Sequence, residues 1–171
     1  MLHVDKLISH SSGIAPALLK RASTLELDWD HRQKSRFEAT DSLGRHIGIF
    51  LPRGQVLRGG DALVAEDGSL IRIVAAPQPV LMITPCIDHG SPFDLMRAAY
   101  HLGNRHVATE LRADHLKIEP DHVLADMLRA MDLTVTELDA AFEPEGGAYG
   151  AREAQHAHSH AGAHAHGHDH H

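Results

Sequence analysis

The chain has 171 residues, a formal net charge of -7, and 43% hydrophobic, 23% charged and 4% aromatic residues. Its single cysteine excludes an internal disulfide, and no apolar run reaches the roughly 18 residues of a membrane span. Acidic residues outnumber basic ones, 23 to 16, without a basic stripe, which argues against nucleic-acid binding. The start, Met1 to Lys6, is too polar to open a signal peptide, so we expect a cytoplasmic protein.

Residues 1–75 are predicted to form a small β domain. Short β-rich runs alternate there with turn signals, and Asp67-Gly68 between two apolar runs is a strong hairpin signal. This spacing fits a small barrel or a two-sheet sandwich, and we interpret the domain as one of a partner-binding or peptide-binding type. The predicted strands are 24–27, 45–51, 62–65 and 70–74.

Two prolines, Pro77 and Pro79, then interrupt the pattern, because proline resists both helix and central strand. We therefore place a domain boundary there and expect a second domain over 76–150. Its order of strand, helix, strand, strand, helix, strand is that of a ferredoxin-like βαββαβ unit, and the whole chain is predicted to be α+β. The predicted strands lie near 80–83, 107–111, 116–118 and 133–136.

The two helices of this unit have different signals. The first has Ser91 as N-cap, Pro92 at the first helical position, Asp94 near the positive end of the helix dipole and Gly103 where a C-terminal cap is expected. The second begins after Pro120-Asp121. It is indicated by apolar residues at helical spacing, namely Val123, Leu124, Met127, Leu128 and Met131.

Residues 151–171 differ from the rest in composition. They contain no Leu, Ile, Val, Phe or Met, so nothing offsets the entropy of ordering them, and we expect a disordered tail. Neutral imidazole is a good ligand for nickel, copper and zinc. An expression tag is the alternative, but Ala, Ser, Gly and Asp interrupt these histidines. The predicted metal ligands of the tail are His156, His158, His160, His164, His166, His168, His170 and His171.

A more ordered candidate ligand is His106, which follows Gly103 at the expected end of a helix. One histidine cannot make a site, but a two-fold axis beside it would bring two copies together in a dimer. The alternative is a solvent-exposed histidine at the start of a strand. The residue pattern by itself leaves both interpretations open.

Other residues have too few partners for a closed site. Cys86 and His89 offer two ligands, and His101 lies on the predicted helix. The Asp-His pairs at 88–89, 114–115 and 121–122 have no spacing that brings them together, as a metal-dependent hydrolase would require. Residues 1–150 contain no phosphate loop, dinucleotide fingerprint or zincin motif. Any nucleotide hydrolysis must therefore come from a partner.

Three blocks of sequence precede the tail in a fixed order. They are Tyr100-His101-Leu102-Gly103-Asn104-Arg105-His106, Asp121-His122-Val123-Leu124-Ala125-Asp126-Met127-Leu128 and Phe142-Glu143-Pro144-Glu145-Gly146-Gly147-Ala148-Tyr149-Gly150. In order and spacing they resemble the family of the urease accessory protein UreE, in which a His-rich tail after the third block is common. The resemblance is specific over the C-terminal half and looser over the β domain.

The resemblance implies a nickel metallochaperone that delivers Ni(II) to the urease maturation complex, and so a carrier and not an enzyme. It implies a homodimer joined through the C-terminal domain, with His106 of each protomer as a nickel ligand at the interface. The implied partners are the GTPase UreG and the accessory complex with apo-urease. His122 matches a secondary metal-binding histidine of some members, although those members carry more histidine where this chain has Glu119-Pro120.

The tail matches the extra nickel capacity of that family, and its imidazoles also accept Zn(II) or Cu(II). A function of a different class remains open beside the metallochaperone. The dense ligands of the tail also fit a metal-storage or detoxification protein whose folded body supports the tail.

Overall fold

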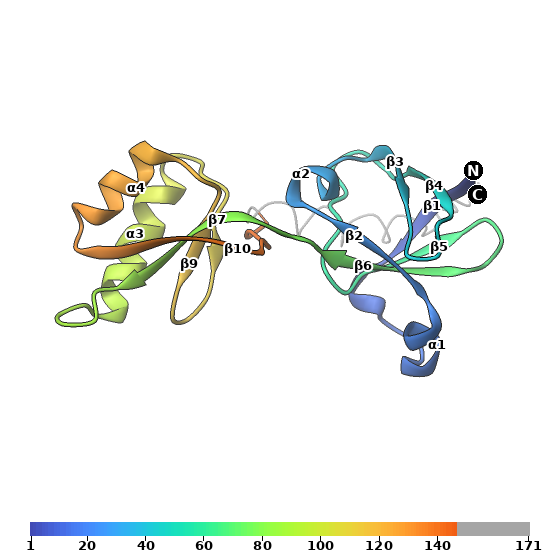
Figure 1. Cartoon of the computed structure of the whole chain (residues 1–171), viewed down its shortest axis with the longest axis horizontal. Helices are drawn as coiled ribbons and strands as arrows, with labels where there is room; N and C mark the ends of the chain where they lie inside the picture. The colour runs from blue at the N-terminus through green and yellow to red at the C-terminus, as the bar shows by residue number, and fades with distance from the viewer. Residues whose placement is uncertain (147–171) are drawn as a thin grey trace, which may run out of the picture.

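Two β-sheets, each with its own hydrophobic core, form the fold of residues 1–146, which are the residues that our computed structural model describes. Figure 1 shows them as two lobes, with residues 2–75 in one and residues 77–141 mainly in the other. Among the described residues, no helix is long and apolar enough to cross a membrane.

The first sheet curls into a barrel that is nearly closed. Its edge strands meet at one end, where the Ser42 N–H donates to the Thr24 carbonyl at 2.8 Å and the Thr24 N–H donates to Ser42 Oγ at 2.9 Å. The barrel alternative of the sequence prediction is thus confirmed. In sheet order, the strands are β2 (Ser23–Leu27), β6 (Leu70–Ala75), β5 (Ala62–Ala65), β1 (Leu2–Ile8), β4 (His46–Phe50) and β3 (Arg36–Thr40).

All four strands predicted in this lobe are present, with ends within one residue of the predicted ones. The hairpin between β5 and β6 turns at Gly68, whose positive φ of 79° suits a residue without a Cβ. Strands β1 and β3 were not predicted, because Val4 is the one fully buried residue of β1, and Phe37 and Ala39 of β3 are half-buried. Three short helical segments complete the lobe: η1 (Ser9–Ser11), α1 (Pro16–Arg21) and α2 (Trp29–Arg32).

The second sheet has the strand order of a ferredoxin-like unit, which confirms that prediction. Two helices pack against it and share its core, to which Leu95, Leu102 and Leu128 contribute from the helical side. The strands are, in sheet order, β10 (Leu133–Ala141), β7 (Pro77–Pro85), β9 (Leu116–Ile118) and β8 (Glu110–Leu111). The helices are α3 (Pro92–Gly103) and α4 (His122–Arg129).

The expectation that Pro77 and Pro79 would break the pattern was wrong, because both lie within β7. This strand pairs with β10 over nine residues, whereas β9 covers residues 81–83 of it. The prolines, including Pro85 at the end of the strand, therefore lie where β7 has a hydrogen-bonded neighbour on one side, and their missing N–H leaves no gap in the ladder with β9. The long β7–β10 pair extends toward the barrel (Figure 1).

Candidate metal-binding site

Helix α3 carries the first motif block at its C-terminal end. Its start is fixed as predicted, because the Ser91 N–H donates to Asp94 Oδ2 at 2.8 Å and Pro92 occupies the first helical position. The hydrogen bonds from Ser91 lower the pKa of the Asp94 carboxyl below its ordinary value. The helix is further held by Leu95 and Leu102, which are buried against the sheet. It is therefore a rigid base for the residues at its end.

His106 takes the left-handed position that ends this helix, with a φ of 56°. Its N–H donates to the Gly103 carbonyl at 2.9 Å, and the Val107 N–H donates to the Leu102 carbonyl at 3.1 Å. This pair of bonds is a Schellman motif. The prediction that Gly103 would cap the helix was wrong. Gly103 is the last helical residue, and the chain continues the turn for two more residues before it reverses at His106.

Glycine is the usual residue at such a position, because a Cβ in the left-handed region costs roughly 1–2 kcal/mol. His106 carries this cost although its side chain is exposed. Strained non-glycine residues of this kind cluster at functional sites. The imidazole is therefore displayed to solvent at a point that the helix end fixes, which suits a metal ligand shared with a second molecule.

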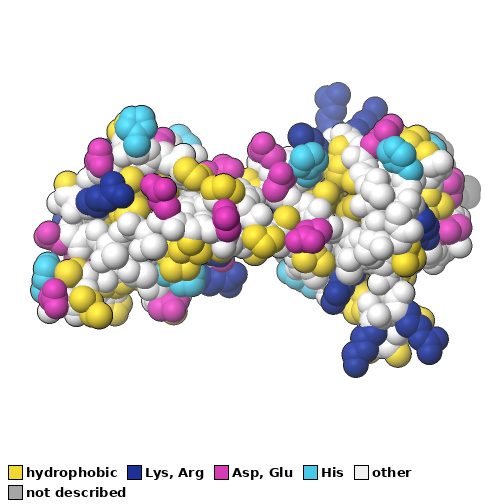
Figure 2. Space-filling model, in the orientation of Figure 1, with side chains coloured by type: hydrophobic (Ala, Val, Ile, Leu, Met, Phe, Trp, Pro, Cys, Tyr) yellow, Lys and Arg dark blue, Asp and Glu magenta, His cyan; other side chains and the backbone are white. Residues whose placement is uncertain are grey.

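Exposed apolar side chains lie along the outer side of α3, whose C-terminal end is close to His106. Phe93, Met96 and Tyr100 are spaced three and four residues apart and are 60%, 61% and 67% exposed. Residues at that spacing share one side of a helix, and exposed apolar groups that lie together mark interaction surfaces. We call these three residues the α3 strip. Figure 2 shows exposed hydrophobic side chains on the lobe that contains α3. The neighbouring His101 is half-buried, and its ring meets the Tyr100 ring edge-on at 5.4 Å.

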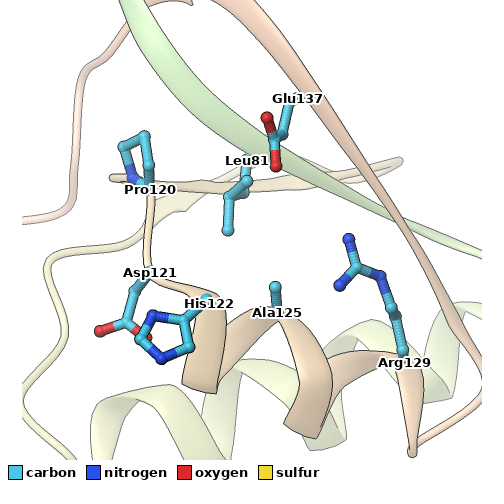
Figure 3. A pocket seen from close by; sticks show the side chains of 7 residues that line it. All are labelled: Leu81, Pro120, Asp121, His122, Ala125, Arg129 and Glu137. Carbon is cyan, nitrogen blue, oxygen red and sulfur yellow. The ribbon is translucent and has the colours of Figure 1, made fainter.

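His122 lies in a different place, at the first turn of α4. It borders a hollow of about 360 Å³, into which Glu137 of β10 and Arg129 of α4 also point (Figure 3). The neighbouring Asp121 caps the helix, as its carboxylate accepts the Leu124 N–H at 2.9 Å. A guanidinium repels a metal cation at short range, so Arg129 disfavours a metal between His122 and Glu137. A secondary metal site at His122 stays a prediction.

Within residues 1–146, no group of three or more histidine, cysteine, aspartate or glutamate side chains is close enough to hold a metal ion. Cys86 Sγ and His89 Nδ1 are 3.6 Å apart, which makes a pair of ligands and no more. His115 Nδ1 bonds Asp114 at 2.8 Å, and this bond lowers the pKa of the Asp114 carboxyl. The eight predicted ligands of the tail lie outside the described residues. A site at His106 therefore needs ligands from another protomer or from the tail.

The third motif block begins at the junction between the lobes. Phe142 is fully buried, and its ring meets the Trp29 ring edge-on at 6.1 Å. The Glu143 carboxylate accepts hydrogen bonds from Arg32 at 2.7 Å and from Arg58 at 3.3 Å. Arg32 is fully buried and also donates to two backbone carbonyl oxygens. These charge-assisted bonds tie the end of β10 to the barrel.

The same block is bonded to the second lobe. The Glu143 N–H donates to Glu110 Oε2 at 2.8 Å, and the Glu145 N–H donates to the Thr109 carbonyl at 2.9 Å. Lys117 Nζ lies 2.9 Å from the Glu110 carboxylate. Burial alone would raise the pKa of Glu110, but the bonds from the Glu143 N–H and from Lys117 bring it below its ordinary value. The block therefore links the two lobes.

Sequence reasoning missed Arg32 and Arg58. They lie 111 and 85 residues before Glu143 in the chain, and neither belongs to a motif. A pairing of single charged residues at that separation has no local signal, so the junction could not be found before the fold was known.

Comparison with known families then decides what kind of protein carries this geometry. The model of the UreE urease accessory protein N-terminal domain matches residues 4–76, and that of the C-terminal domain matches residues 78–171. The chain belongs to the UreE family. Membership confirms the resemblance read from the three blocks, and it places the chain among accessory proteins of urease, not among enzymes.

Individual UreE relatives are similar over most of this chain. The urease accessory protein UreE of Polaromonas naphthalenivorans is 73% identical over 151 residues, which cover 88% of this chain and 73% of the relative. That of Paracidovorax citrulli is 74% identical over 88% of this chain and 72% of the relative. That of Paraburkholderia xenovorans is 51% identical, with 88% and 65% covered.

Proposed function

We propose that this member of the UreE family binds Ni(II) and delivers it to the urease maturation complex in the cytoplasm. Family membership supports the nickel cargo and the destination. The observation that carries the site is the strained, exposed His106 at the rigid end of α3. His10, Ser11 and Asp132 also have a positive φ, so this conformation supports a ligand role for His106 together with its exposed place at the helix end and in the first motif block.

We propose further that two chains form a homodimer along the α3 strip. Three large apolar side chains that are each more than half exposed support this, because a partner surface would remove them from water. A two-fold axis near the end of α3 would place the two copies of His106 on one Ni(II) ion. Two imidazoles leave coordination positions open, so tail histidines or an incoming acceptor can bind before the first ligands leave.

The tail would then act as a reservoir, and the paired histidines would act as the exchange point. In our proposal the acceptor is UreG, within the accessory complex that loads apo-urease. The same imidazoles accept Zn(II) and Cu(II), so metal choice would rest on the partner and on metal supply as much as on ligand type. His122 would serve as a peripheral ligand at most, because Arg129 shares its hollow.

Replacement of His106 with Ala tests the exchange point. We expect loss of one nickel equivalent per two chains in a calorimetric titration and loss of urease activation in an assay with the accessory proteins. His101→Ala is the matched control, since this half-buried neighbour should change neither result. Deletion of residues 151–171 should lower nickel stoichiometry and leave part of the activation. Normal activation by the His106 variant would refute the proposed exchange point.

The dimer can be tested on the same protein. Met96→Lys places a charge on the α3 strip and should convert the dimer to a monomer in light scattering. Leu111→Lys is the control, because Leu111 is also exposed, at 44%, but lies on β8. A monomeric parent protein, or a dimer that survives Met96→Lys, would contradict this arrangement.

Metal storage is a second candidate function. The lack of a closed three-ligand group within residues 1–146 favours it, since most ligands would then belong to the tail. Storage predicts that deletion of residues 151–171 removes metal tolerance of the cell, whereas His106→Ala leaves it intact. The metallochaperone predicts the opposite ranking of the two variants in urease activation.

The division of labour between the lobes is also a proposal. We assign residues 76–150 to metal binding and dimerisation, residues 151–171 to metal supply, and residues 1–75 to contact with a partner. Support for the last assignment comes from the barrel itself, whose two edge strands are not fully paired.

A further inference from the structure

The barrel is open between its edge strands β2 and β3. They are joined by hydrogen bonds at one end, and beyond that end lies a hollow of about 450 Å³ that both strands and the start of α2 line. An open sheet edge exposes N–H and C=O groups that another strand can pair with. We call this opening the barrel seam and define it by Glu26, Asp28, Glu38 and Thr40.

On β2, the backbone groups of every second residue face the seam. Thr24 bonds across to Ser42 at the joined end, whereas the Leu27 carbonyl faces the other way and accepts the Ala76 N–H at 2.9 Å. Because successive residues of a strand direct their N–H and C=O groups to opposite sides, the backbone groups of Glu26 face the seam with those of Thr24.

The same alternation applies to β3. The Asp41 N–H donates to the Arg45 carbonyl at 3.1 Å on the side of β4, so the backbone groups of Glu38 and Thr40 face the seam. Within residues 1–146, no backbone hydrogen bond crosses the seam at Glu26, Glu38 or Thr40. The two edges are therefore both ready to pair with one inserted strand.

The rim of the seam is acidic. Glu26 and Glu38 are exposed, and Asp28 is half-buried. Two histidines face these carboxylates: His31 Nδ1 is 2.7 Å from Asp28, and His46 Nε2 is 3.9 Å from Glu38. The rim thus has three carboxylates and two imidazoles, so its carboxylates can accept hydrogen bonds from the cationic side chains of a partner.

The floor of the seam is apolar. Leu25 and Leu27 of β2 point into the barrel and are buried, and Ala39 of β3 is half-buried. A strand laid in the seam would turn one side of its residues to this floor and the other side to the acidic rim, because side chains alternate along a strand. The segment that fits has small apolar residues at every second position, facing the floor, and basic residues at the positions between them, facing the rim.

We propose that the barrel seam binds an extended segment of a partner protein in which Lys or Arg alternates with small apolar residues, added as a strand between β2 and β3. The barrel of a second copy of this chain fits poorly, since both of its edge strands, β2 and β3, carry Glu and like charges opposite one another are destabilising. The pairing would use backbone bonds for affinity and the rim for selection.

This inference rests on the proposal that the barrel is the partner-binding lobe, and it involves no nickel ligand named above. Its test therefore uses metal-free, full-length protein, and a nickel titration of the same sample reports separately on His106. Failure of either measurement leaves the other interpretable.

The probe is a capped heptapeptide in which Lys and Val alternate, and its matched control has the same composition with all Lys first. We expect the alternating peptide to bind and to slow amide hydrogen exchange at Glu26, Glu38 and Thr40. Exchange at Leu25 and Leu27, whose amides face β6, should not change. The block peptide should bind at least about tenfold more weakly, because it cannot present one face to the floor and one to the rim.

The double variant Glu26→Lys, Glu38→Lys should weaken binding by about tenfold or more, since it turns attraction into repulsion. The double variant Asp5→Lys, Asp139→Lys changes net charge equally at exposed positions outside the seam and should bind normally. Thermal melting of both variants shows that each is folded.

Three outcomes would overturn the inference. The first is no protection of Glu26, Glu38 and Thr40 by the alternating peptide, which would mean that the charges merely keep the edges from pairing. The second is equal binding of the two peptides or equal weakening by the two double variants. The third is protection of these amides in the free chain that disappears on deletion of residues 151–171, because the occupant would then be the tail.

Discussion

The junction between the lobes and the end of α3 both carry motif blocks of this family, but their polar side chains differ in burial and in pairing. At the junction, Phe142 is buried, the Glu143 carboxylate meets Arg32, and the neighbouring Glu110 meets Lys117. At the end of α3, His106 is exposed and has a strained backbone, and within residues 1–146 its side chain makes no hydrogen bond. The Glu143 carboxylate is therefore paired within the chain, whereas the His106 side chain is available to bind a metal ion from outside.

This difference teaches how to separate structural from functional motifs in one chain. A motif whose polar groups are all paired contributes to stability, because removal of one member leaves the others unpaired. A motif that carries strain and exposure contributes little to stability and is retained for another reason. The two regions should therefore respond in opposite directions to mutation.

The largest effect is expected at the junction. Arg32→Met keeps most of the side-chain volume but removes the Arg32 donors to Glu143 and to two backbone carbonyl oxygens. Glu143 keeps the bonds from Arg58 and from the Gly59 N–H. We expect the free energy of unfolding in urea to fall by about 3 kcal/mol. Arg36→Met, at an exposed position of β3, should change it by less than about 0.5 kcal/mol. An unfolding curve of the Arg32 variant that matches that of the parent protein would show that the paired charges at the junction do not stabilise the fold.

A smaller, pH-dependent effect is expected from Glu110→Gln, about 1–2 kcal/mol of unfolding free energy at neutral pH. The pKa of Glu110 is lowered below its ordinary value of 4.5 in the fold, so its ionised form stabilises the native state above that value. This contribution is lost as pH falls through the lowered pKa. Urea unfolding of parent and variant should therefore converge in acid. A difference that stays constant from neutral pH to below pH 4 would contradict this account.

At the end of α3, mutation should raise stability. His106→Gly relieves the left-handed strain and should increase the unfolding free energy by about 1 kcal/mol, whereas His106→Ala keeps the strain and should not. Both variants should lose the nickel equivalent assigned to His106. Calorimetric melting of the two variants side by side measures the strain directly. If the Gly variant is no more stable than the Ala variant, the helix end stores no strain.

The smallest effect is expected three residues earlier. Gly103 lies in the helix and has no neighbouring atom within 4 Å of an added Cβ, so Gly103→Ala should raise stability by about 0.5 kcal/mol through helix propensity. Had Gly103 been the left-handed cap, the same change would destabilise the protein. Loss of stability on this substitution would thus show that Gly103, and not His106, is the left-handed residue that ends the helix.

Much of the fold was predictable because it follows from local patterns. The turn at Gly68, the start of α3 at Ser91 and the cap of α4 at Asp121 each depend on neighbours within a few residues. Strands β1 and β3 escaped prediction because few of their residues are buried, which leaves a weak apolar pattern. Pro77 misled for a different reason, since proline is tolerated in a strand when one side has no partner, and that depends on the tertiary structure.

The candidate site divides in the same way. His106 could be selected from its place after a helix and from the family motif, but its left-handed conformation could not, because the motif contains a glycine three residues earlier that is the better local candidate for it. The Arg129 guanidinium beside His122 was equally hidden, since the hollow that they share exists once α4 packs near β10.

The bond between the Glu145 N–H and the Thr109 carbonyl bears on how often a tail histidine meets His106. It pins the chain three residues from His106, and the first tail histidine, His156, follows eleven residues later, within a contour of at most about 40 Å. If the tail histidines bind metal as we propose, the covalent link would hold His156 near this anchor at an effective concentration on the order of millimolar. Shortening or lengthening the stretch 146–155 would therefore tune a rate of encounter without altering a single metal ligand.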